Sequence, residues 1–267
     1  AGVDTHYAYS TPMASTDYGC GITRSGAGTV ADPYTYSVDP AFVNRPVNYV
    51  DWLDAARFAN WLHNGQPTGA QNLSTTEDGA YFLPGAVDGD GVLTVTRKAD
   101  WKWAIPSEDE WYKAAYYNPA TATYFDYPTS TNTVPGRDMT ETTNPGNNAN
   151  YMGTPYPIDF PYYRTEVGDF ELSVSPYGTF DQGGNIYEWN ESSFLIPGYF
   201  GSSQGIRGGC YYNQRERMHA AYRGHSYWGG GSSNFGFRVV QVPEPGTTAL
   251  LTLGCVGFLG RRRSVRG

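Results

Sequence analysis

Residues 207–238 read RGGCYYNQRERMHAAYRGHSYWGGGSSNFGFR, a frame that opens on Arg-Gly-Gly and closes on Asn-Phe-Gly-Phe-Arg. Its recurring glycines predict short strands separated by tight turns, here and across residues 166–241. The stretch between its two ends is rich in tyrosine, asparagine, arginine, serine and glycine and contains no further cysteine. Rigid aromatic side chains among adaptable polar ones are typical of ligand-binding loops. The alternative is that residues such as Tyr211, Tyr212 and Tyr222 simply pack in strands and core.

Upstream, residues 46–65 read PVNYVDWLDAARFANWLHNG and predict a helix. Apolar side chains recur on one face at helical spacing. They are Trp52, Ala55, Ala56, Ala59 and Leu62, with Phe58 beside them. Asp51 is placed to cap the start of this helix, and Gly65 follows its last turn.

A second helix is predicted within residues 104–117, AIPSEDEWYKAAYY. Ser107 and Glu110 have the spacing of a capping box, in which each side chain accepts a hydrogen bond from the other residue's backbone N–H. The side chains expected to face inward are Trp111, Ala114 and Ala115.

The remaining segments contain few periodic patterns. Residues 1–45 and 118–165 are predicted to be loops, the former with short strands. Asp-Gly-Asp-Gly at 88–91 offers only two acidic positions, so we interpret it as a hairpin turn between Phe82-Leu83 and Val92–Thr96 rather than a calcium loop. Two helices, short strands and much loop indicate an irregular α+β domain.

Four segments, in this order, resemble the signatures of the formylglycine-generating enzyme (sulfatase-modifying factor) family. They are PVNYVDWLDAARFANWL, IPSEDEWYKAAYY, YGTFDQGGNIYEWNE at 177–191, and the RGG and NFGFR ends of the frame. The resemblance implies a variant of the C-type lectin fold, with two helices beside a distorted antiparallel sheet and much loop. We expect this domain to occupy residues 1–242. The family's first strand and helix normally precede a region like Tyr7–Thr23, so we expect N-terminal sequence to be missing.

The resemblance also implies structural calcium. By position, the ligands would be the Asp181 side chain, the Gly184 and Ile186 carbonyls and the Glu188 carboxylate, a set of hard oxygen donors that suits Ca²⁺. The alternative is a turn in which Asp181 caps backbone N–H groups and Glu188 pairs with an arginine. A second family site would map to Asn150, the Tyr151 carbonyl and Asp159.

The family's oxidation chemistry is not expected. The resemblance places the two copper-binding cysteines of formylglycine-generating enzymes at Asn213 and near Met218, and neither an amide nor a thioether replaces a thiolate pair for Cu(I). Cys210 stands where the family usually has serine. We interpret it as a buried structural cysteine, with a reactive thiol as the alternative.

The family's cleft is nevertheless expected to persist without its oxidation centre. Tyr187 takes the place of a pocket tryptophan, and Asn234 matches a pocket asparagine. The residues predicted to line a ligand pocket are Tyr187, Cys210, Asn213, Trp228 and Asn234.

The C-terminal segment 243–267 is predicted to be a sorting signal. Residues 242–267 read VPEPGTTALLTLGCVGFLGRRRSVRG, with a Pro-Glu-Pro motif, an apolar run and an arginine cluster in order. About 14 helical residues span only ~21 Å, less than the ~30 Å hydrocarbon core of a bilayer. The arrangement resembles the PEP-CTERM signal of Gram-negative-type bacteria, which implies an exosortase as partner and a transient membrane anchor. An ordinary short tail anchor is the alternative.

The net charge of the domain argues against one class of partner, and its cysteine content limits the disulfides that can form. Residues 1–242 carry 14 basic and 25 acidic side chains, a net charge of −11, so we do not expect nucleic acid as a partner. Cys255 lies in the tail, which leaves Cys20 and Cys210 as the one disulfide that could form within the domain.

Together these patterns predict an exported protein at the cell surface or in the extracellular matrix. We expect it to be non-catalytic, calcium-stabilised and ligand-binding, with a glycan or a peptide as ligand. One alternative is a divergent oxidase or other enzyme that modifies protein cysteines. Another is a purely structural component of the surface layer.

Overall fold

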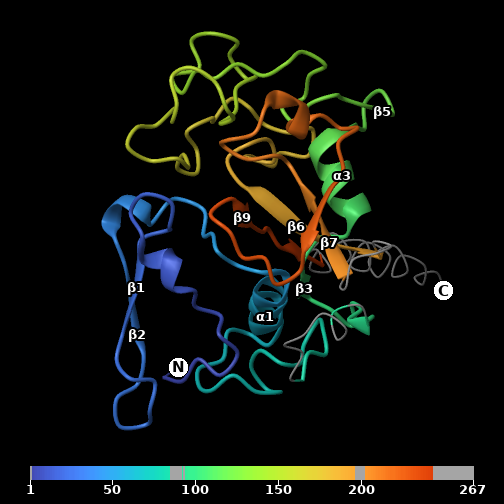
Figure 1. The fold of residues 1–267 in the computed structure, drawn as a ribbon. Coiled ribbons are helices and arrows are strands. Elements are labelled where there is room, and N and C mark those ends of the chain that lie inside the picture. The colour runs from blue at the N-terminus through green and yellow to red at the C-terminus, as the bar shows by residue number, and fades with distance from the viewer. Residues whose placement is uncertain (1, 85–91, 93, 196–201, 243–267) are drawn as a thin grey trace, which may run out of the picture.

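The computed structural model describes residues 2–84, 92, 94–195 and 202–242 (Figure 1). Its largest sheet has four strands in the order β8-β7-β6-β9. The strands are β6 (Tyr187–Leu195), β7 (Ser202–Arg207), β8 (Gly224–Tyr227) and β9 (Phe235–Gly236). β6 pairs antiparallel with β7 and parallel with β9, and the β6–β7 register shifts between Trp189 and Ser193. The predicted α+β class with a distorted sheet is confirmed.

The structure also has three two-stranded sheets. They pair β1 (Ile22–Ser25) with β2 (Thr35–Val38), β3 (Trp103–Ala104) with β10 (Val240–Gln241), and β4 (Tyr117–Asn118) with β5 (Thr123–Tyr124). Short 3₁₀ turns occur at η1 (Thr11–Ala14), η2 (Pro40–Phe42) and η3 (Arg215–Met218). The β1–β2 hairpin stands apart at the N-terminal side of the molecule, blue in Figure 1.

The first predicted helix is α1 (Trp52–His63), with the capping residue that the sequence indicates. Asp51 accepts from the Asp54 N–H, the Asp54 carboxylate accepts from the Asp51 N–H, and Gly65 follows with a φ of +80°. The buried face differs from the prediction at one place. Leu53 is 1% exposed, whereas Leu62 is only partly buried. Leu53 shares a row with Ala56 and Asn60 at i, i+3 and i+7, so the buried stripe is wider than the predicted one.

The second predicted helix is α3 (Glu108–Tyr116), which begins directly after the predicted cap Ser107, and Ala104 at the start of the predicted segment belongs to β3 instead. Both hydrogen bonds of the predicted capping box between Ser107 and Glu110 are present. Trp111 and Ala115 are buried as predicted, whereas Ala114 is only partly buried.

Two tryptophan side chains join α1 to the main sheet through hydrogen bonds. The Trp52 indole donates to the Asn190 carbonyl on β6 at 2.9 Å, and the Trp189 indole on β6 donates to the Val50 carbonyl before α1 at 3.1 Å. Both rings are at most 2% exposed, so each buries a large apolar surface while its N–H is satisfied. This reciprocal pair fixes where β6 lies against the start of α1.

The long segment between β5 and β6 forms loops over one end of the sheet, green to yellow in Figure 1. In this segment, hydrogen bonds from buried polar side chains take the place of the backbone hydrogen bonds that pair strands in a sheet. The Asn148 amide donates to the carbonyls of Thr143 and Asn144, and Glu141, 5% exposed, accepts from the Ser173 hydroxyl and the Leu172 N–H. Loop backbone that is buried needs such partners, because an unpaired polar group costs free energy in the interior.

The hairpin predicted around residues 88–91 does not appear in its described parts. Phe82 and Leu83 lie in no strand, and Val92 and Thr94 have helical backbone. Leu83 and Val92 are fully buried, so the described ends are held by core packing rather than by a ladder. Residues 85–91 and 93, and the predicted sorting segment 243–267, lie outside the described residues.

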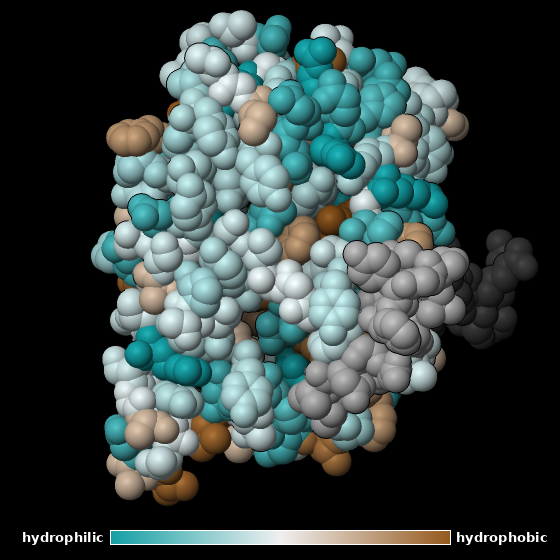
Figure 2. Space-filling view, viewed as in Figure 1, coloured by the Kyte–Doolittle hydropathy of each residue, from teal (hydrophilic) through white to brown (hydrophobic). Residues whose placement is uncertain are grey.

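The face of the molecule in Figure 2 is mainly polar, with isolated apolar residues. Within the described parts of the chain, no helix has both the length and the apolar composition needed to cross a membrane.

Candidate functional site

Gly208 and Gly209 follow β7 and form a turn that places Cys210 in the interior of the domain. Gly208 and Gly209 adopt φ values of +92° and +75°, which glycine reaches without strain. A Cβ on Gly208 would lie 2.8 Å from the Gln182 carbonyl oxygen, so a larger residue would collide with backbone. Arg207, 1% exposed, anchors the turn through an ion pair with Glu108 on α3 and a hydrogen bond to the Ala220 carbonyl.

Cys210 is fully buried between two asparagines. Its thiol donates to Asn213 Oδ1 at 3.0 Å, and Asn234 Nδ2 lies 3.9 Å from the sulfur. Burial raises the pKa of the Cys210 thiol to about 11. The thiol is therefore protonated and weakly nucleophilic near neutral pH.

Cys20 and Cys210 are both free and buried, and each lies in a different hydrophobic cluster. The structure therefore does not form the one disulfide that the sequence leaves open within the domain.

Four of the five predicted pocket residues, Tyr187, Cys210, Asn213 and Asn234, are joined by hydrogen bonds, whereas Trp228 shares only the main hydrophobic cluster with Tyr187 and Cys210. The Tyr187 N–H donates to the Asn234 carbonyl at 2.8 Å, and Tyr187, Cys210 and Trp228 belong to the same hydrophobic cluster. Asn213 joins them through the Cys210 thiol. Tyr187, Asn234 and Trp228 are only 4–6% exposed, so these residues form a closed cluster rather than the lining of an open cleft.

Five tyrosines lie over this cluster, and we call them the tyrosine surface. They are Tyr18, Tyr156, Tyr163, Tyr211 and Tyr212. Tyr163 is the hub, with ring centroids 4.7 Å from Tyr18, 5.7 Å from Tyr156 and 5.4 Å from Tyr211. Tyr211 continues the chain to Tyr212 at 5.4 Å. Tyr18, Tyr156 and Tyr212 are 40–47% exposed, so part of each of these outer rings is accessible to solvent.

The tyrosine surface is connected to the buried cluster by hydrogen bonds. Asn234 Nδ2 donates to the Tyr212 hydroxyl at 3.1 Å, and the Tyr211 hydroxyl bonds the Ser233 hydroxyl at 3.1 Å. Beneath it, Arg164, 1% exposed, donates to the Tyr18 carbonyl. The rings therefore rest on a fixed polar support rather than on a mobile loop.

None of these five tyrosines is among the predicted pocket residues. Tyr211 and Tyr212 fall in the loop that the sequence singles out, whereas Tyr18, Tyr156 and Tyr163 come from segments more than forty residues away. The one available signal was the content of 23 tyrosines, which does not indicate which of them meet in space.

Two members of the first predicted calcium set, Glu188 and the Gly184 carbonyl, are engaged by protein groups. Arg238 donates to both oxygens of the Glu188 carboxylate, and the Trp111 indole donates to Glu188 Oε2 at 2.6 Å. The Gly184 carbonyl accepts from the Ile186 N–H at 2.7 Å. A cation that used Glu188 would thus compete with Arg238, an arrangement that matches the arginine pairing left open by the sequence.

Asp181 differs from Glu188, because no ion pair joins it to a described residue. Burial raises the pKa of its carboxyl to about 6, and the nearby Arg238 guanidinium opposes this shift. Its φ of +58° places it in the left-handed region. Asp181 is the member of the set that would gain most from a cation.

The second predicted set is spread over separate contacts. Asn150 donates to the Tyr163 carbonyl and to Asn185 Oδ1, the Tyr151 hydroxyl donates to the Pro135 carbonyl, and Asp159 pairs with Arg45. Across the described ranges, no cluster of three or more His, Cys, Asp or Glu side chains could hold a metal. Calcium at either set stays a prediction.

With this geometry in place, the comparisons with known proteins give the family. Residues 14–243 match the family model for the sulfatase-modifying factor enzyme 1-like domain, and the chain belongs to this family. Residues 241–263 match the PEP-CTERM protein-sorting motif. The motif identifies a protein exported toward the cell surface of a Gram-negative-type bacterium and recognised by exosortase sorting machinery.

Two curated relatives carry the description serine/threonine-protein kinase pkn1. The chain is 20% identical to the Chlamydia pneumoniae protein over 218 residues, which are 76% of this chain and 25% of that protein. It is 32% identical to the Chlamydia caviae protein over 82 residues, which are 26% of this chain and 13% of that one. The chain thus spans a quarter or less of the relatives' lengths.

Several solved structures are similar in fold. Treponema denticola variable protein 1 has a TM-score of 0.49 at 21% identity, with 75% of this chain and 72% of that chain covered. CarF has a TM-score of 0.49 at 17% identity, with 84% and 75% covered. PvdO from Pseudomonas aeruginosa has a TM-score of 0.43 at 19% identity, with 81% and 68% covered.

Proposed function

We propose that this exported domain binds a ligand at the tyrosine surface and does not oxidise cysteine. The observation that carries the proposal is the state of the family's reaction position. Asn213 and Met218 stand there, Met218 is 1% exposed, and the neighbouring Cys210 thiol is buried with a raised pKa. A reaction that needs two accessible thiolates has no pair of groups to use at this position.

The tyrosine surface supports binding as the remaining role. Tyrosine combines a rigid apolar ring with a hydroxyl, so it contributes contact area and hydrogen bonds at low entropic cost. Tyr212 is already oriented by Asn234, and Tyr211 by Ser233. A flat sugar face or an extended peptide suits exposed rings of this kind, so we propose a glycan or a peptide as ligand.

The test is binding of the purified protein to glycan and peptide arrays, followed by titration of the strongest hit. Tyr212→Ala and Tyr156→Ala are expected to weaken the hit at least tenfold. Tyr124→Ala is the matched control, because Tyr124 is 50% exposed and makes its ring contacts with Tyr112 and Tyr117 instead. Equal affinity in all three variants would place the ligand elsewhere and overturn the proposal.

The alternative, an enzyme that modifies protein cysteines, has one specific requirement. An enzyme that uses Cys210 must expose and deprotonate this thiol during its cycle, against both its burial and its hydrogen bond to Asn213. Retained cysteine-modifying activity that is lost in Cys210→Ala would support this alternative over the binding role.

A further inference from the structure

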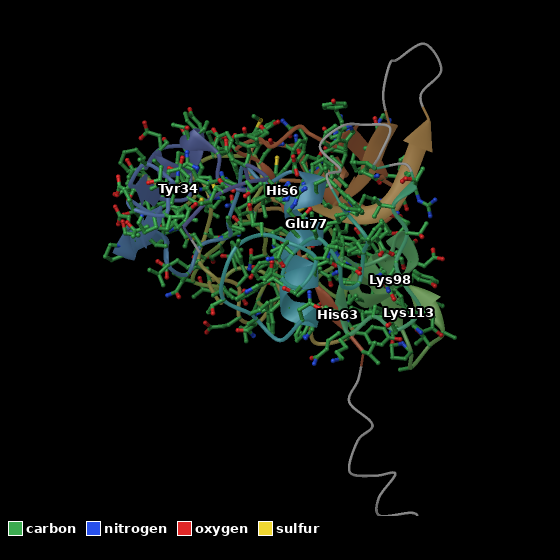
Figure 3. All side chains as sticks on the ribbon, turned by 90° about the horizontal axis from the view of Figure 1, so that it is seen from below. His6, Tyr34, His63, Glu77, Lys98 and Lys113 are labelled. Carbon is green, nitrogen blue, oxygen red and sulfur yellow. The ribbon has the colours of Figure 1, made fainter. Side chains whose placement is uncertain are left out.

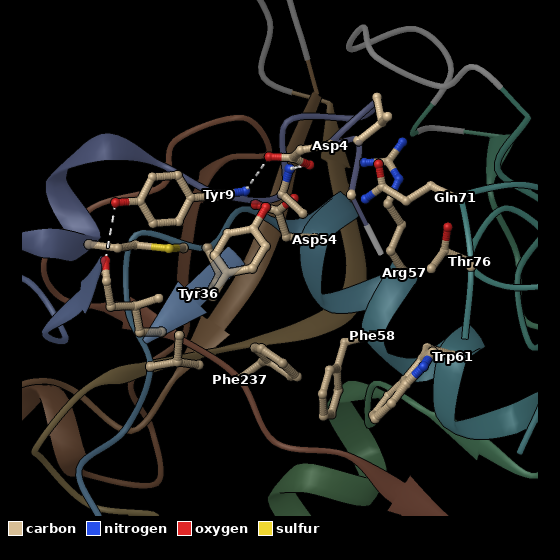
Figure 4. A pocket seen from close by; sticks show the side chains of 18 residues that line it. Asp4, Tyr9, Tyr36, Asp54, Arg57, Phe58, Trp61, Gln71, Thr76 and Phe237 are labelled. Carbon is tan, nitrogen blue, oxygen red and sulfur yellow. Dashed lines mark hydrogen bonds between the residues drawn. The ribbon is translucent and has the colours of Figure 1, made fainter. Parts of the chain in front are cut away.

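A cavity lies on another part of the molecule, between the N-terminal segment, the β1–β2 hairpin and α1 (Figure 4). Its volume is about 530 Å³, within the range typical of small-molecule sites. None of the five residues of the tyrosine surface lines it, and neither does any predicted pocket residue. It is therefore a separate candidate site.

One end of the cavity is aromatic. Phe58 lies between Trp61 and Phe237, with ring centroids 5.6 Å and 5.3 Å away, and the three rings stand together in Figure 4. Phe58 is 41% exposed although it sits on α1, whose other apolar residues are mostly buried. An exposed phenylalanine at the wall of a cavity supplies contact area for an apolar guest.

The other end is polar and acidic. Asp4, Asp54, Arg57, Gln71 and Thr76 line it, and Figure 4 shows Asp4 and Asp54 close to the Tyr36 ring. Two of its charges are already balanced. Asp4 pairs with Arg24 at 3.1 Å, and Arg57 pairs with Glu77 at 3.0 Å.

His6 also contacts Glu77, at 3.5 Å, and the two lie side by side in Figure 3. The labelled lysines of that view, Lys98 and Lys113, lie on the far side of the molecule from Tyr34 of the hairpin. No lysine lines the cavity. Of the two lining aspartates, Asp54 is therefore the one whose charge no ion pair balances among the described residues.

Asp54 is the lining carboxylate that no ion pair joins to a described residue. Its Oδ2 accepts from the Asp51 N–H at 3.1 Å. Burial and the adjacent Asp51 raise the pKa of the Asp54 carboxyl, and the Arg57 guanidinium opposes this shift. A cation that reached Asp54 would relieve both effects, because an opposite charge favours the ionised carboxylate.

We propose that this cavity binds a small organic amine with an apolar, ring-bearing body. The protonated amine lies against Asp54, and the body extends along Phe58 and Phe237. Charge complementarity selects a cation over an anion, and the aromatic end selects an apolar body over a free inorganic cation. This proposal is independent of the ligand at the tyrosine surface.

The probe for the test is dansylcadaverine, a fluorescent dansyl group on a primary alkylamine, titrated with the full chain. Its counterpart is dansyl-aminohexanoate, which carries the same fluorophore on a carboxylate. We expect saturable enhancement of dansylcadaverine emission and at least tenfold weaker binding of the carboxylate. No saturable change, or equal affinity for both probes, would overturn the proposal.

Single-residue variants test where in the protein dansylcadaverine binds. Asp54→Asn keeps an oxygen that can accept from the Asp51 N–H and removes the charge, so it should weaken dansylcadaverine at least tenfold. Phe58→Ala changes an exposed wall residue and should weaken both probes. Glu171→Gln, an equal charge change on an exposed residue outside the cavity, and Tyr212→Ala should change neither.

Circular dichroism confirms that each variant is folded before titration. Unchanged binding in Asp54→Asn and Phe58→Ala, or loss of binding in Tyr212→Ala, would assign the probe to another surface and contradict the proposal. If Asp54→Asn fails to fold, the comparison of the two probes and Phe58→Ala decide the question.

Discussion

At the scale of single residues, ion pairs and hydrogen bonds fix the side chains around Glu188 and Cys210. Arg207 pairs with Glu108 and thereby joins β7 to α3, and Arg238 pairs with Glu188 on β6. The buried Cys210 thiol donates a hydrogen bond to the partly buried Asn213. The sequence is sufficient to show that residues 211–238 contain no cysteine, whereas the burial of Cys210 depends on the fold.

The raised pKa of Cys210 predicts a dependence of stability on pH. The unfolded thiol ionises near pH 9 and the folded thiol near 11, so the folded state binds more protons between these values. The free energy of unfolding of the wild type, relative to Cys210→Ala, should therefore fall by roughly 2–3 kcal/mol as pH rises from 8.5 to 11. Urea unfolding at several pH values measures it. A constant difference across this range would mean that the thiol is not buried as described.

The Glu188–Arg238 pair predicts a large cost on mutation. Glu188→Gln leaves Arg238 and the Trp111 indole with an uncharged partner in a buried site, and it should lower the free energy of unfolding by about 2–4 kcal/mol. Glu216→Gln is the control, since Glu216 pairs with Arg215 on the surface and should cost less than about 0.5 kcal/mol. Similar costs for both variants in urea unfolding would contradict the assigned roles.

At the scale of elements, the helices were predictable and most of the loops were not. The capping residues at Asp51 and Ser107 are local signals, and both act as the sequence indicates. The segment from β5 to β6 depends instead on buried side chains such as Asn148 and Glu141, whose partners lie up to 32 residues away. No local pattern encodes those partners, and the tyrosine surface escaped prediction for the same reason.

The capping box of α3 gives a test at this scale. Ser107→Ala removes the oxygen that accepts from the Glu110 N–H, and it should destabilise the protein by about 1 kcal/mol. Differential scanning calorimetry should show a Tm about 2–4 °C lower. Thr121→Ala, at an exposed loop hydroxyl, should leave Tm unchanged. A larger effect of Thr121→Ala than of Ser107→Ala would argue against the assigned cap.

At the scale of the whole molecule, the family scaffold carries two separate candidate binding regions. The tyrosine surface is hydrogen-bonded to Asn234, and the cavity lies between α1 and the β1–β2 hairpin. The sequence singles out the loop that contains Tyr211 and Tyr212, but it does not indicate the cavity, because a cavity forms only where distant segments fail to fill the space between them. The PEP-CTERM motif directs both regions to the outside of the cell.

The calcium prediction is tested on the whole molecule by thermal unfolding. Free Ca²⁺ at about 100 times its Kd should add about 2.7 kcal/mol to the free energy of unfolding and raise Tm by several degrees over EGTA. Asp181→Asn should abolish the increase if the first set holds the ion, and Asp159→Asn if the second does. Identical melting in 10 mM calcium and in EGTA would show that Arg238 and Arg45 serve in place of the cation.

The most direct test of the central claim is mass spectrometry of a cysteine-containing sulfatase-motif peptide incubated with this protein, Cu(I) and oxygen. A competent formylglycine-generating enzyme serves as the positive control. We predict that the peptide mass stays unchanged, because Asn213 and the buried Met218 occupy the reaction position. Conversion of the peptide's cysteine to formylglycine would contradict the account and place a catalytic centre where this structure has a closed, hydrogen-bonded cluster.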